Sequence, residues 1–244
     1  MADSVEWRKW LTAEALNRQW GWHEAGKQGP GRLVLEGKDL RGLSVAHLRG
    51  VRLVRCDLTG ARMPRLLEDI ELVGCTLDGA QLGSAALERA KIDDCRFVKA
   101  DLSLVNMSDA QIRIADFTDA EFENSTWSRA TVKNGRFSRA RLVGAQLDDA
   151  AFSGCDFRAA KLTRNRPVFD ELGTAYATRF EDCDLRDADV DGLRIRGTKL
   201  VRCAFAGVHG KPAIEGPYTV TDPDLSTDRD GSAAPADQIY ALWG

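Results

Sequence analysis

Large apolar residues recur every five positions through the middle of this chain. From Leu72 to Leu162, nineteen consecutive repeats follow one another without a slip. A small or compact residue, most often alanine, lies two positions before nearly every large residue. A period of five fits neither an α-helix, with about 3.6 residues per turn, nor a β-strand, with a repeat of about two, so the pattern indicates a solenoid.

Each five-residue unit is expected to form one side of a four-sided coil. The large and the small residue point inward, the other three face water, and coils stack through backbone hydrogen bonds at roughly 4.8 Å. The core is then a ladder of side chains without room for a substrate. Earlier apolar residues, from Leu35 to Leu48, start the first coil, with a register slip between Leu40 and Leu43.

Nine further repeats flank the main run, with large residues at Leu53, Leu58, Met63, Phe180, Leu185, Val190, Ile195, Leu200 and Phe205. The 28 clear repeats predict about seven coils. At strand spacing, seven coils give a rod of roughly 34 Å.

Several repeats read A-(D/N)-L-x-x or nearly so, as in residues 56–60 (Cys-Asp-Leu-Thr-Gly), 100–104 (Ala-Asp-Leu-Ser-Leu) and 183–187 (Cys-Asp-Leu-Arg-Asp). In these stretches the chain resembles the pentapeptide-repeat family. The resemblance implies an all-β solenoid, a right-handed quadrilateral β-helix. It also implies a target, because members of the Qnr and MfpA types act on DNA gyrase, either as mimics of the DNA duplex or through loops that project from the coils.

Prolines and breaks in the repeat divide the chain into three segments. Residues 1–32 are predicted as an N-terminal helical cap, since apolar residues line one side of residues 4–20 at Trp7, Trp10, Leu11, Ala15, Leu16 and Trp20. Residues 33–208 form the β-helix. Residues 209–244 form a polar C-terminal tail, in which the acidic stretch 221–237 is expected to be a mobile linker.

Two breaks interrupt the β-helix, at about 64–70 and 163–177. The first is expected to be a bulge or short loop at a corner. The second is the candidate partner-binding loop, with Arg164, Arg166, Phe169, Asp170, Glu171 and Tyr176. Long loops on rigid scaffolds often carry function, but they also arise in solenoids as neutral insertions, so both interpretations stay open.

The chain ends in an apolar cluster, Ile239, Tyr240, Leu242 and Trp243. Such a cluster is too costly to leave in water without a docking site. The far end of the solenoid and a second subunit of a homodimer are the two alternatives.

Catalytic and metal-binding patterns do not emerge from the sequence. The histidines His23, His47 and His209 are far apart, and the carboxylates fall on the outward face of a convex rod. The six cysteines occupy inward small-residue slots, which favours buried thiols over a disulfide or a metal site. We therefore expect a protein that is not an enzyme and uses no cofactor or metal.

Charge and hydropathy argue against direct nucleic-acid or membrane partners. The net charge is −3, like charges do not cluster, and no apolar stretch approaches membrane-spanning length. The first residues lack the pattern of a secretory signal, which predicts a cytoplasmic protein.

Over residues 71–164, the outward-facing residues of the four sides carry net charges of +1, −2, 0 and 0. Rungs of opposite sign alternate on one side, which predicts salt bridges along a ladder instead of the negative stripe of a DNA mimic. The favoured hypothesis is a non-enzymatic rod that binds a protein. DNA gyrase or topoisomerase IV, in antibiotic resistance or self-resistance, is the most specific candidate partner, and a structural or regulatory scaffold is the alternative.

Overall fold

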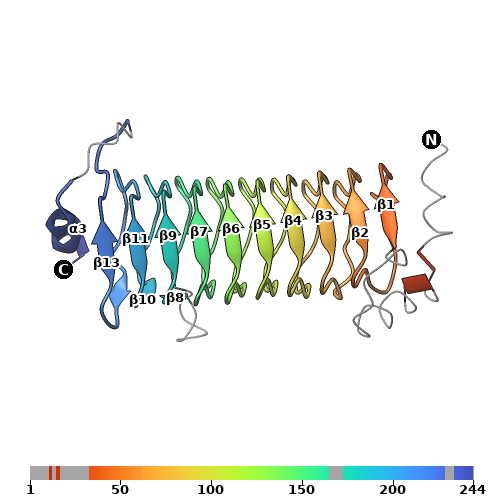
Figure 1. The fold of residues 1–244 in the computed structure, drawn as a ribbon, viewed down its shortest axis with the longest axis horizontal. Coiled ribbons are helices and arrows are strands. Elements are labelled where there is room, and N and C mark those ends of the chain that lie inside the picture. Colours follow the sequence, from red (N-terminus) through yellow and green to blue (C-terminus); the bar gives the residue numbers. More distant parts are fainter. Residues whose placement is uncertain (1–10, 13–14, 17–32, 165–172, 229–233, 244) are drawn as a thin grey trace.

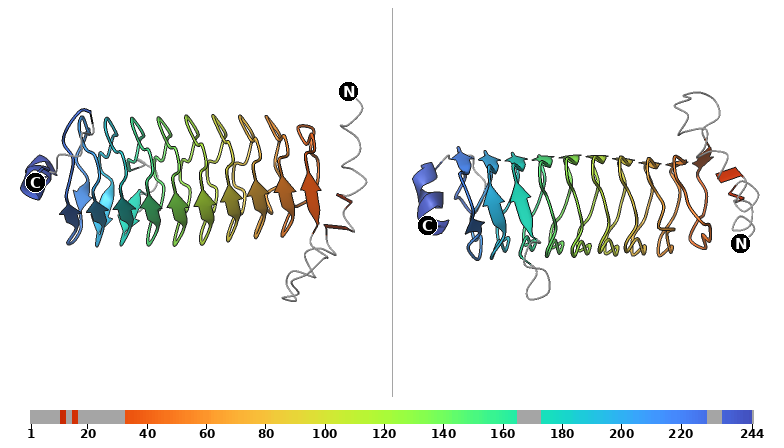
Figure 2. Two further views of the ribbon diagram at one scale, coloured as in Figure 1. Left: turned by 45° about the horizontal axis from the view of Figure 1, so that its top comes forward. Right: turned by 90° about the horizontal axis from the view of Figure 1, so that it is seen from below.

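The backbone winds into a straight rod of stacked coils (Figures 1 and 2). The computed structural model describes residues 11–12, 15–16, 33–164, 173–228 and 234–243. One side of the rod is a ten-stranded parallel sheet with one strand per coil, so the ten strands bound nine full coils. Among the described residues, no helix is both long and apolar enough to cross a bilayer.

The ten-stranded sheet defines side 1 of the rod. Its strands are β1 (Val34–Glu36), β2 (Arg52–Val54), β3 (Glu71–Val73), β4 (Lys91–Asp93), β5 (Gln111–Arg113), β6 (Thr131–Lys133), β7 (Ala151–Ser153), β9 (Arg179–Glu181), β11 (Lys199–Val201) and β13 (Thr219–Thr221). Following the chain from each of these strands, the next three sides are called sides 2, 3 and 4.

Side 4 carries a second, three-stranded sheet near the C-terminal end, formed by β8 (Thr174–Tyr176), β10 (Arg194–Arg196) and β12 (Ala213–Ile214). Elsewhere, sides 2, 3 and 4 are joined by single parallel bridges between neighbouring coils, such as Asp57 with Thr76 and Arg62 with Gln81. Helix α3 (Ala236–Trp243) follows the last coil.

The predicted number of about seven coils is wrong, because the ladder begins earlier and ends later than the clear repeats. Leu35 already pairs with Leu53, and Leu200 still pairs with Val220. Nine coils correspond to a rod of about 43 Å. Asp224, predicted in a mobile linker, instead bridges Ala204 and is buried.

The breaks in the repeat appear as coils of unusual length. Most coils have twenty residues, but Leu35 pairs with Leu53 after eighteen and Leu53 with Leu72 after nineteen. Phe152 pairs with Phe180 after twenty-eight. The first break therefore shortens a coil that keeps its four sides, whereas the second inserts eight residues into one coil.

Each corner of a coil is turned by the residue two positions after the large core residue. This residue has a positive φ, between about 50° and 70° on most rungs. Glycine adopts this conformation freely, and Asp and Asn tolerate it better than other residues. The corner needs one such residue per side, which explains why the period is five and why Gly, Asp and Asn recur at that position.

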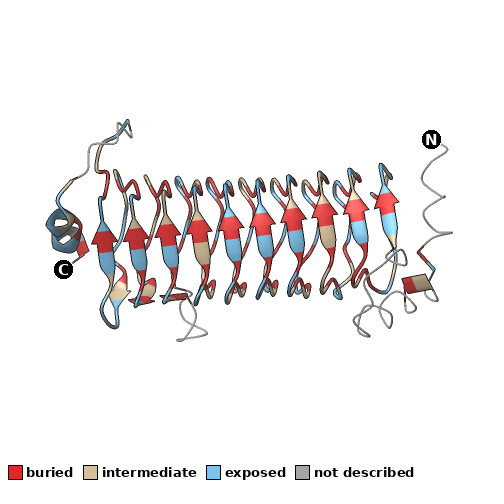
Figure 3. Cartoon of the chain, in the orientation of Figure 1, coloured by how far each residue is buried: buried red, intermediate tan, exposed pale blue. Residues whose placement is uncertain are grey.

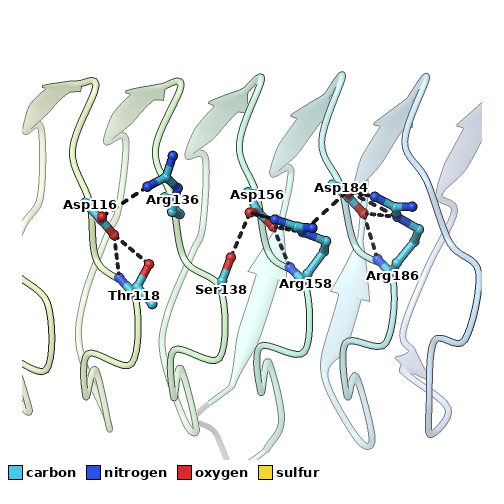
Figure 4. A network of polar contacts seen from close by, with 8 residues as sticks. All are labelled: Asp116, Thr118, Arg136, Ser138, Asp156, Arg158, Asp184 and Arg186. Atoms are coloured by element: carbon cyan, nitrogen blue, oxygen red, sulfur yellow. Dashed lines mark hydrogen bonds and ion pairs between the residues drawn. The ribbon is translucent and has the colours of Figure 1, made fainter. Parts of the chain in front are cut away.

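The Asp or Asn before the core residue also has a structural role (Figure 4). Asp116 Oδ1 accepts a hydrogen bond from the Thr118 backbone N–H at 3.0 Å, and Asp156 does the same for Arg158. The ladder between coils leaves this N–H unused, so the carboxylate satisfies it locally. In the A-(D/N)-L-x-x pattern, the Asp or Asn thus satisfies a backbone N–H, while the Ala and the Leu fill the core.

The core is a column of buried apolar side chains. Figure 3 marks the buried and exposed positions that alternate along each coil. Phe97, Phe117, Phe137 and Phe157 stack on successive coils, with ring centroids 4.7 to 5.1 Å apart. Trp127 is fully buried, and its Nε1 donates a hydrogen bond to Ser125 Oγ at 2.9 Å. Ser125 fills a slot that most repeats give to alanine, because a buried indole N–H needs an acceptor.

All six cysteines are buried in the small-residue column before side 2, as the sequence predicted. Their Sγ atoms lie 3.3 to 3.7 Å from backbone carbonyl oxygens, as for Cys95 with Asp93 and Cys155 with Val132. They act as small apolar residues with a weak donor.

The single helix predicted for residues 4–20 is not continuous. Leu11 and Thr12 are not helical, and Thr12 Oγ1 accepts a hydrogen bond from the Ala15 N–H at 3.2 Å. This is the geometry of an N-cap, for which threonine is well suited, and Ala15 and Leu16 are helical. Leu11 and Leu16 are buried against the core. The remaining residues of the predicted cap, Trp7, Trp10 and Trp20 among them, lie outside the described residues.

Replacement of Ile114 by Asn should stabilise the protein. Ile114 turns a corner at φ 52° and is 48% exposed, so a β-branched residue sits in a strained conformation with little gain from burial. We expect Ile114→Asn to raise the free energy of unfolding by about 1 kcal/mol. Asn134 turns the same corner on the next coil, and Asn134→Ile should have the opposite effect. Urea denaturation followed by circular dichroism checks both, and a shift of the same sign in both variants would contradict the argument.

Loss of the Ser125 hydroxyl should destabilise the middle of the rod. Ser125→Ala leaves the buried Trp127 N–H without an acceptor, which costs about 1–3 kcal/mol. In a Trp127→Phe background the N–H is gone, so the same serine substitution should cost much less. A double-mutant cycle measured by denaturation tests this coupling, and equal costs in the two backgrounds would speak against it.

Candidate functional site

Outward charges of adjacent coils pair with one another over most of the rod. Residues twenty positions apart stack in one column, which brings an arginine against an aspartate of the next coil at 2.6 to 2.7 Å in the pairs Arg89–Asp69, Arg113–Asp93, Arg129–Asp109 and Arg139–Asp119. This agrees with the predicted ladder of salt bridges. Each exposed pair stabilises the fold little, but together they leave no uniformly acidic side.

Hydrogen bonds from Arg129 hold the pKa of Asp109 below its usual range. Those from Arg139 hold the pKa of Asp119 below its usual range. At Asp156, partial burial opposes ionisation, but hydrogen bonds from the Arg158 side chain and backbone outweigh it and lower the pKa. Because the groups are charged and already paired, they are poorly placed for general acid or base chemistry.

Two groups of polar contacts lie along side 2 (Figure 4): one joins Asp116, Thr118 and Arg136, and the other joins Ser138, Asp156, Arg158, Asp184 and Arg186. Arg158 lies between Asp156 at 2.8 Å and the buried Asp184 at 3.8 Å. Arg186 continues the chain of contacts, with Nη2 at 2.6 Å from Asp184. The acidic and basic groups along this side pair with one another, so the face is nearly neutral.

Arg164 and Gly173, the described residues on either side of the eight-residue insertion, form a narrow neck on the corner between sides 3 and 4. The ladder holds the chain up to the neck, because Thr163 accepts a hydrogen bond from the Gly144 N–H and Gly173 accepts one from the Arg194 N–H. Gly173 has φ +89°, and a Cβ on it would lie 2.8 Å from the Arg164 Cα. The two ends of the insertion therefore touch, and only glycine fits at this point.

Tyr176 was predicted in the loop but lies in β8, beside the neck. The ladder resumes at Thr174, because Gln146 on the preceding coil pairs with it. Ala175 then takes the inward position and is fully buried. The predicted loop is thus shorter at its C-terminal end than the sequence suggested.

The Tyr176 side chain is held between charged residues of the next two coils. The Arg196 guanidinium lies 4.6 Å from the centre of the tyrosine ring, and the Tyr176 hydroxyl donates a hydrogen bond to Glu215. Glu215 also accepts from Arg194 Nε at 2.5 Å. Partial burial and the hydrogen bond to Glu215 raise the pKa of Tyr176. A fixed tyrosine flanked by arginines is typical of binding hot spots.

Arg194, Arg196 and Glu215 were missed in the sequence. Arg196 follows Tyr176 by twenty residues, so the column rule already contained the signal once the register after the insertion was known. Of the other predicted loop residues, Arg164 lies at the neck, while Arg166, Phe169, Asp170 and Glu171 lie outside the described residues.

The C-terminal cluster docks on the end of the same rod. Ile239 and Trp243 of α3 are buried, and the Trp243 ring packs edge-on against Phe205 at 5.9 Å. Tyr240 is partly exposed, and its hydroxyl accepts a hydrogen bond from the Val220 N–H at the last strand. Leu242 is part of α3, but its side chain lies outside what the structure describes. These contacts within the chain lie at the far end of the solenoid, and a homodimer contact stays a prediction.

The interior offers no substrate-sized space near this end. The void bordered by Ala175, Phe205 and Trp243 measures about 30 Å³ and has an apolar lining. In the described part of the chain, no three histidine, cysteine, aspartate or glutamate side chains are grouped so as to hold a metal ion.

The five-residue register, the left-handed corners and the stacked columns agree with a family model described as "Pentapeptide repeat region", which matches residues 70–147. Residues 70–147 therefore belong to the pentapeptide-repeat family. A search of curated proteins finds no match to this pentapeptide-repeat chain.

Solved structures similar to this pentapeptide-repeat protein share little sequence with it. HetL of the cyanobacterium Nostoc sp. strain PCC 7120, involved in regulation of heterocyst differentiation, is 18% identical, with 88% of this chain and 97% of HetL covered and a TM-score of 0.40. Trypsin-treated QnrB1, a plasmid-mediated fluoroquinolone resistance protein, is 16% identical, with 81% and 92% covered and a TM-score of 0.38. Rfr23 of the cyanobacterium Cyanothece 51142 is 20% identical, with 57% and 92% covered and a TM-score of 0.27.

Substitution of Gly173 should cost more stability than substitution of a corner glycine. Gly37 also has a positive φ, but no atom lies within 4 Å of a Cβ added to it. Gly37→Ala should cost about 1 kcal/mol for the backbone conformation alone. Gly173→Ala adds a clash with the Arg164 backbone and should cost clearly more. Chemical denaturation of the two variants tests this, and equal losses would show that the neck is not tight.

Proposed function

We propose that this pentapeptide-repeat rod is a non-enzymatic protein that binds a protein partner through the insertion at residues 165–172 and the adjoining Tyr176, Arg194 and Arg196 on side 4. The observation that carries the proposal is the neck. One coil is eight residues longer than its neighbours, yet the ladder keeps its register on both sides of the neck, next to a surface of tyrosine and arginine. Tyrosine and arginine are enriched in protein interfaces.

The pairing of surface charges supports loop-mediated binding over mimicry of DNA. A duplex mimic needs a sustained negative stripe to compete for a basic groove. Here the arginines neutralise the aspartates rung by rung, as in Arg139 with Asp119 and Arg202 with Asp182. Binding by shape and by the insertion remains available to such a surface.

A type II topoisomerase, DNA gyrase or topoisomerase IV, is the specific partner we propose, and the role would be protection against an antibiotic or self-produced poison. This part of the proposal rests on the resemblance of the repeats to proteins of the Qnr and MfpA types. A structural or regulatory scaffold is the alternative if neither enzyme responds.

Deletion of residues 165–172 separates the loop from the rod. Joining Arg164 to Gly173 places Ala175 five residues after Leu162 and gives the long coil its usual twenty residues. The neck geometry allows the join, since a Cβ on Gly173 would lie 2.8 Å from the Arg164 Cα. We expect a folded rod with nearly unchanged thermal stability.

The deletion variant and the wild type should then be compared in supercoiling by gyrase and topoisomerase IV and in fluoroquinolone-induced DNA cleavage. We expect the wild type to protect against cleavage or inhibit supercoiling, and the deletion to lose at least tenfold in potency. A folded deletion variant with full potency would contradict the role of the loop. No effect of the wild type on either enzyme would contradict the topoisomerase assignment and favour a scaffold.

A further inference from the structure

Among the residues that the structure describes, the backbone ladder is open at a rung on side 3 of the second coil. Arg62 pairs with Gln81 on its C-terminal side. On its N-terminal side, no described residue forms a hydrogen bond with its backbone N–H or C=O. At the equivalent position of side 2, both groups are used, because Asp57 N–H donates to Lys38 C=O and Asp57 C=O accepts from the Leu40 N–H.

The opening follows from the lengths of the first two coils. Asp39 pairs with Asp57, and His47 pairs with Leu66. Between these two rungs the first coil is one residue shorter than the second. The second coil is in turn one residue shorter there than the coils that follow it. Residues 43–46 therefore pass the second coil without pairing to Arg62. The gap is a groove of about 820 Å³ lined by residues 43–46 and 62–66 and by Gln81, Gly83 and Asp101.

Pro64 does not block pairing at this rung. It occupies the position after the core residue, where the ladder between coils uses the C=O but not the N–H. On side 2, for example, the Asp78 C=O accepts the Gly60 N–H of the preceding coil. The C=O of Pro64 receives no such bond from a described residue. The open rung thus offers one donor, at Arg62, and two acceptors, at Arg62 and Pro64.

The groove also carries two arginines that are exceptions to the charge pairing of the rod. Arg62 Nε donates a hydrogen bond to Gln81 Oε1 at 3.3 Å and is in no ion pair within the described chain. Within the same limits the Arg65 side chain has no ion-pair or hydrogen-bond partner, although its backbone C=O accepts a hydrogen bond from the Ala86 N–H. Both are exposed, three residues apart, before and after the same core residue.

The rod itself shows what fits onto such a rung. Residues 115–119, Ala-Asp-Phe-Thr-Asp, lie on residues 135–139, Gly-Arg-Phe-Ser-Arg. Phe117 N–H donates to Arg136 C=O at 2.7 Å, Asp119 N–H donates to Ser138 C=O, and Arg136 N–H donates to Ala115 C=O. The side chains add ion pairs of Asp116 with Arg136 and of Asp119 with Arg139.

Arg62 and Arg65 stand at the same two repeat positions as Arg136 and Arg139. We propose that the groove binds an extended acidic peptide segment of a partner protein, with carboxylates three residues apart, which adds the missing rung by parallel backbone pairing. Three backbone hydrogen bonds and two ion pairs recognise it, as in strand addition to a sheet edge. This surface is separate from the insertion on the corner between sides 3 and 4 and does not depend on the proposed function.

The probe is an Ala-Asp-Phe-Thr-Asp peptide that carries fluorescein at its N-terminus and is amidated at its C-terminus. Fluorescence anisotropy with the full chain at low ionic strength should show saturable binding. A peptide with both aspartates replaced by asparagine should bind about tenfold more weakly, or about 1.4 kcal/mol. Added salt should reduce this difference, because exposed ion pairs are screened.

The protein side is tested by Arg62→Glu/Arg65→Glu, which should weaken binding at least tenfold. Lys133→Glu/Lys199→Glu is the matched control. It makes the same change in net charge at two exposed side 1 lysines that have no ion pair within the described residues, and it should bind normally. Thermal unfolding shows whether both variants are folded. A peptide with lysine in place of each aspartate should regain affinity for the glutamate variant.

Backbone pairing is separated from simple charge attraction by methylation of the phenylalanine nitrogen in the peptide. That N–H corresponds to the one Phe117 donates to Arg136 C=O, so its loss should abolish binding. Equal binding of the methylated peptide would overturn the proposal, as would equal binding to the folded Arg62→Glu/Arg65→Glu variant. Absence of saturable binding up to about 1 mM peptide, near −4 kcal/mol, would overturn it as well.

Discussion

The parallel backbone ladder between coils is the constraint on which the whole molecule depends. Each coil can hydrogen-bond to the next only if the chain turns sharply after every fifth residue, and the turn requires a positive φ. The cost of this conformation is repeated at every corner. It is offset by a core that is buried without interruption from Leu35 to Val220. Local strain and long-range burial are therefore coupled along the entire rod.

The sequence predicted the regular coils well and their ends poorly. A strict repeat with inward Leu or Phe leaves no doubt about register, and the buried cysteines and paired surface charges follow from it. At the C-terminal end the last coil uses Val220 and Asp224 after a run of prolines and glycines, so tertiary pairing overrides a sequence that looks like a linker. At the N-terminal end, the predicted helix is interrupted at Leu11 and Thr12 although the apolar residues keep a helical period. The Thr12 hydroxyl there accepts the hydrogen bond of an N-cap.

The candidate binding surfaces were only partly visible in the sequence. The insertion was found because it breaks the period, but Tyr176 was assigned to it because the point where the register resumes depends on which coil pairs with Thr174. The partners of Tyr176, Arg196 on the next coil and Glu215 on the one after, could not be named without that register. The open rung at Arg62 was hidden for a related reason, since it arises from two short coils and not from any unusual residue.

Because Arg164 and Gly173 are in close contact at the neck, the segment between them can be replaced by another sequence without changing the coils. The two flanking residues meet at the corner of a coil, so the backbone hydrogen bonds on either side do not depend on the sequence between them. Doubling the length of a flexible loop adds only about 0.6 kcal/mol of closure entropy. Evolution can thus rewrite the length and composition of this segment at little thermodynamic cost, and an engineer could graft recognition loops there while the scaffold keeps its registry.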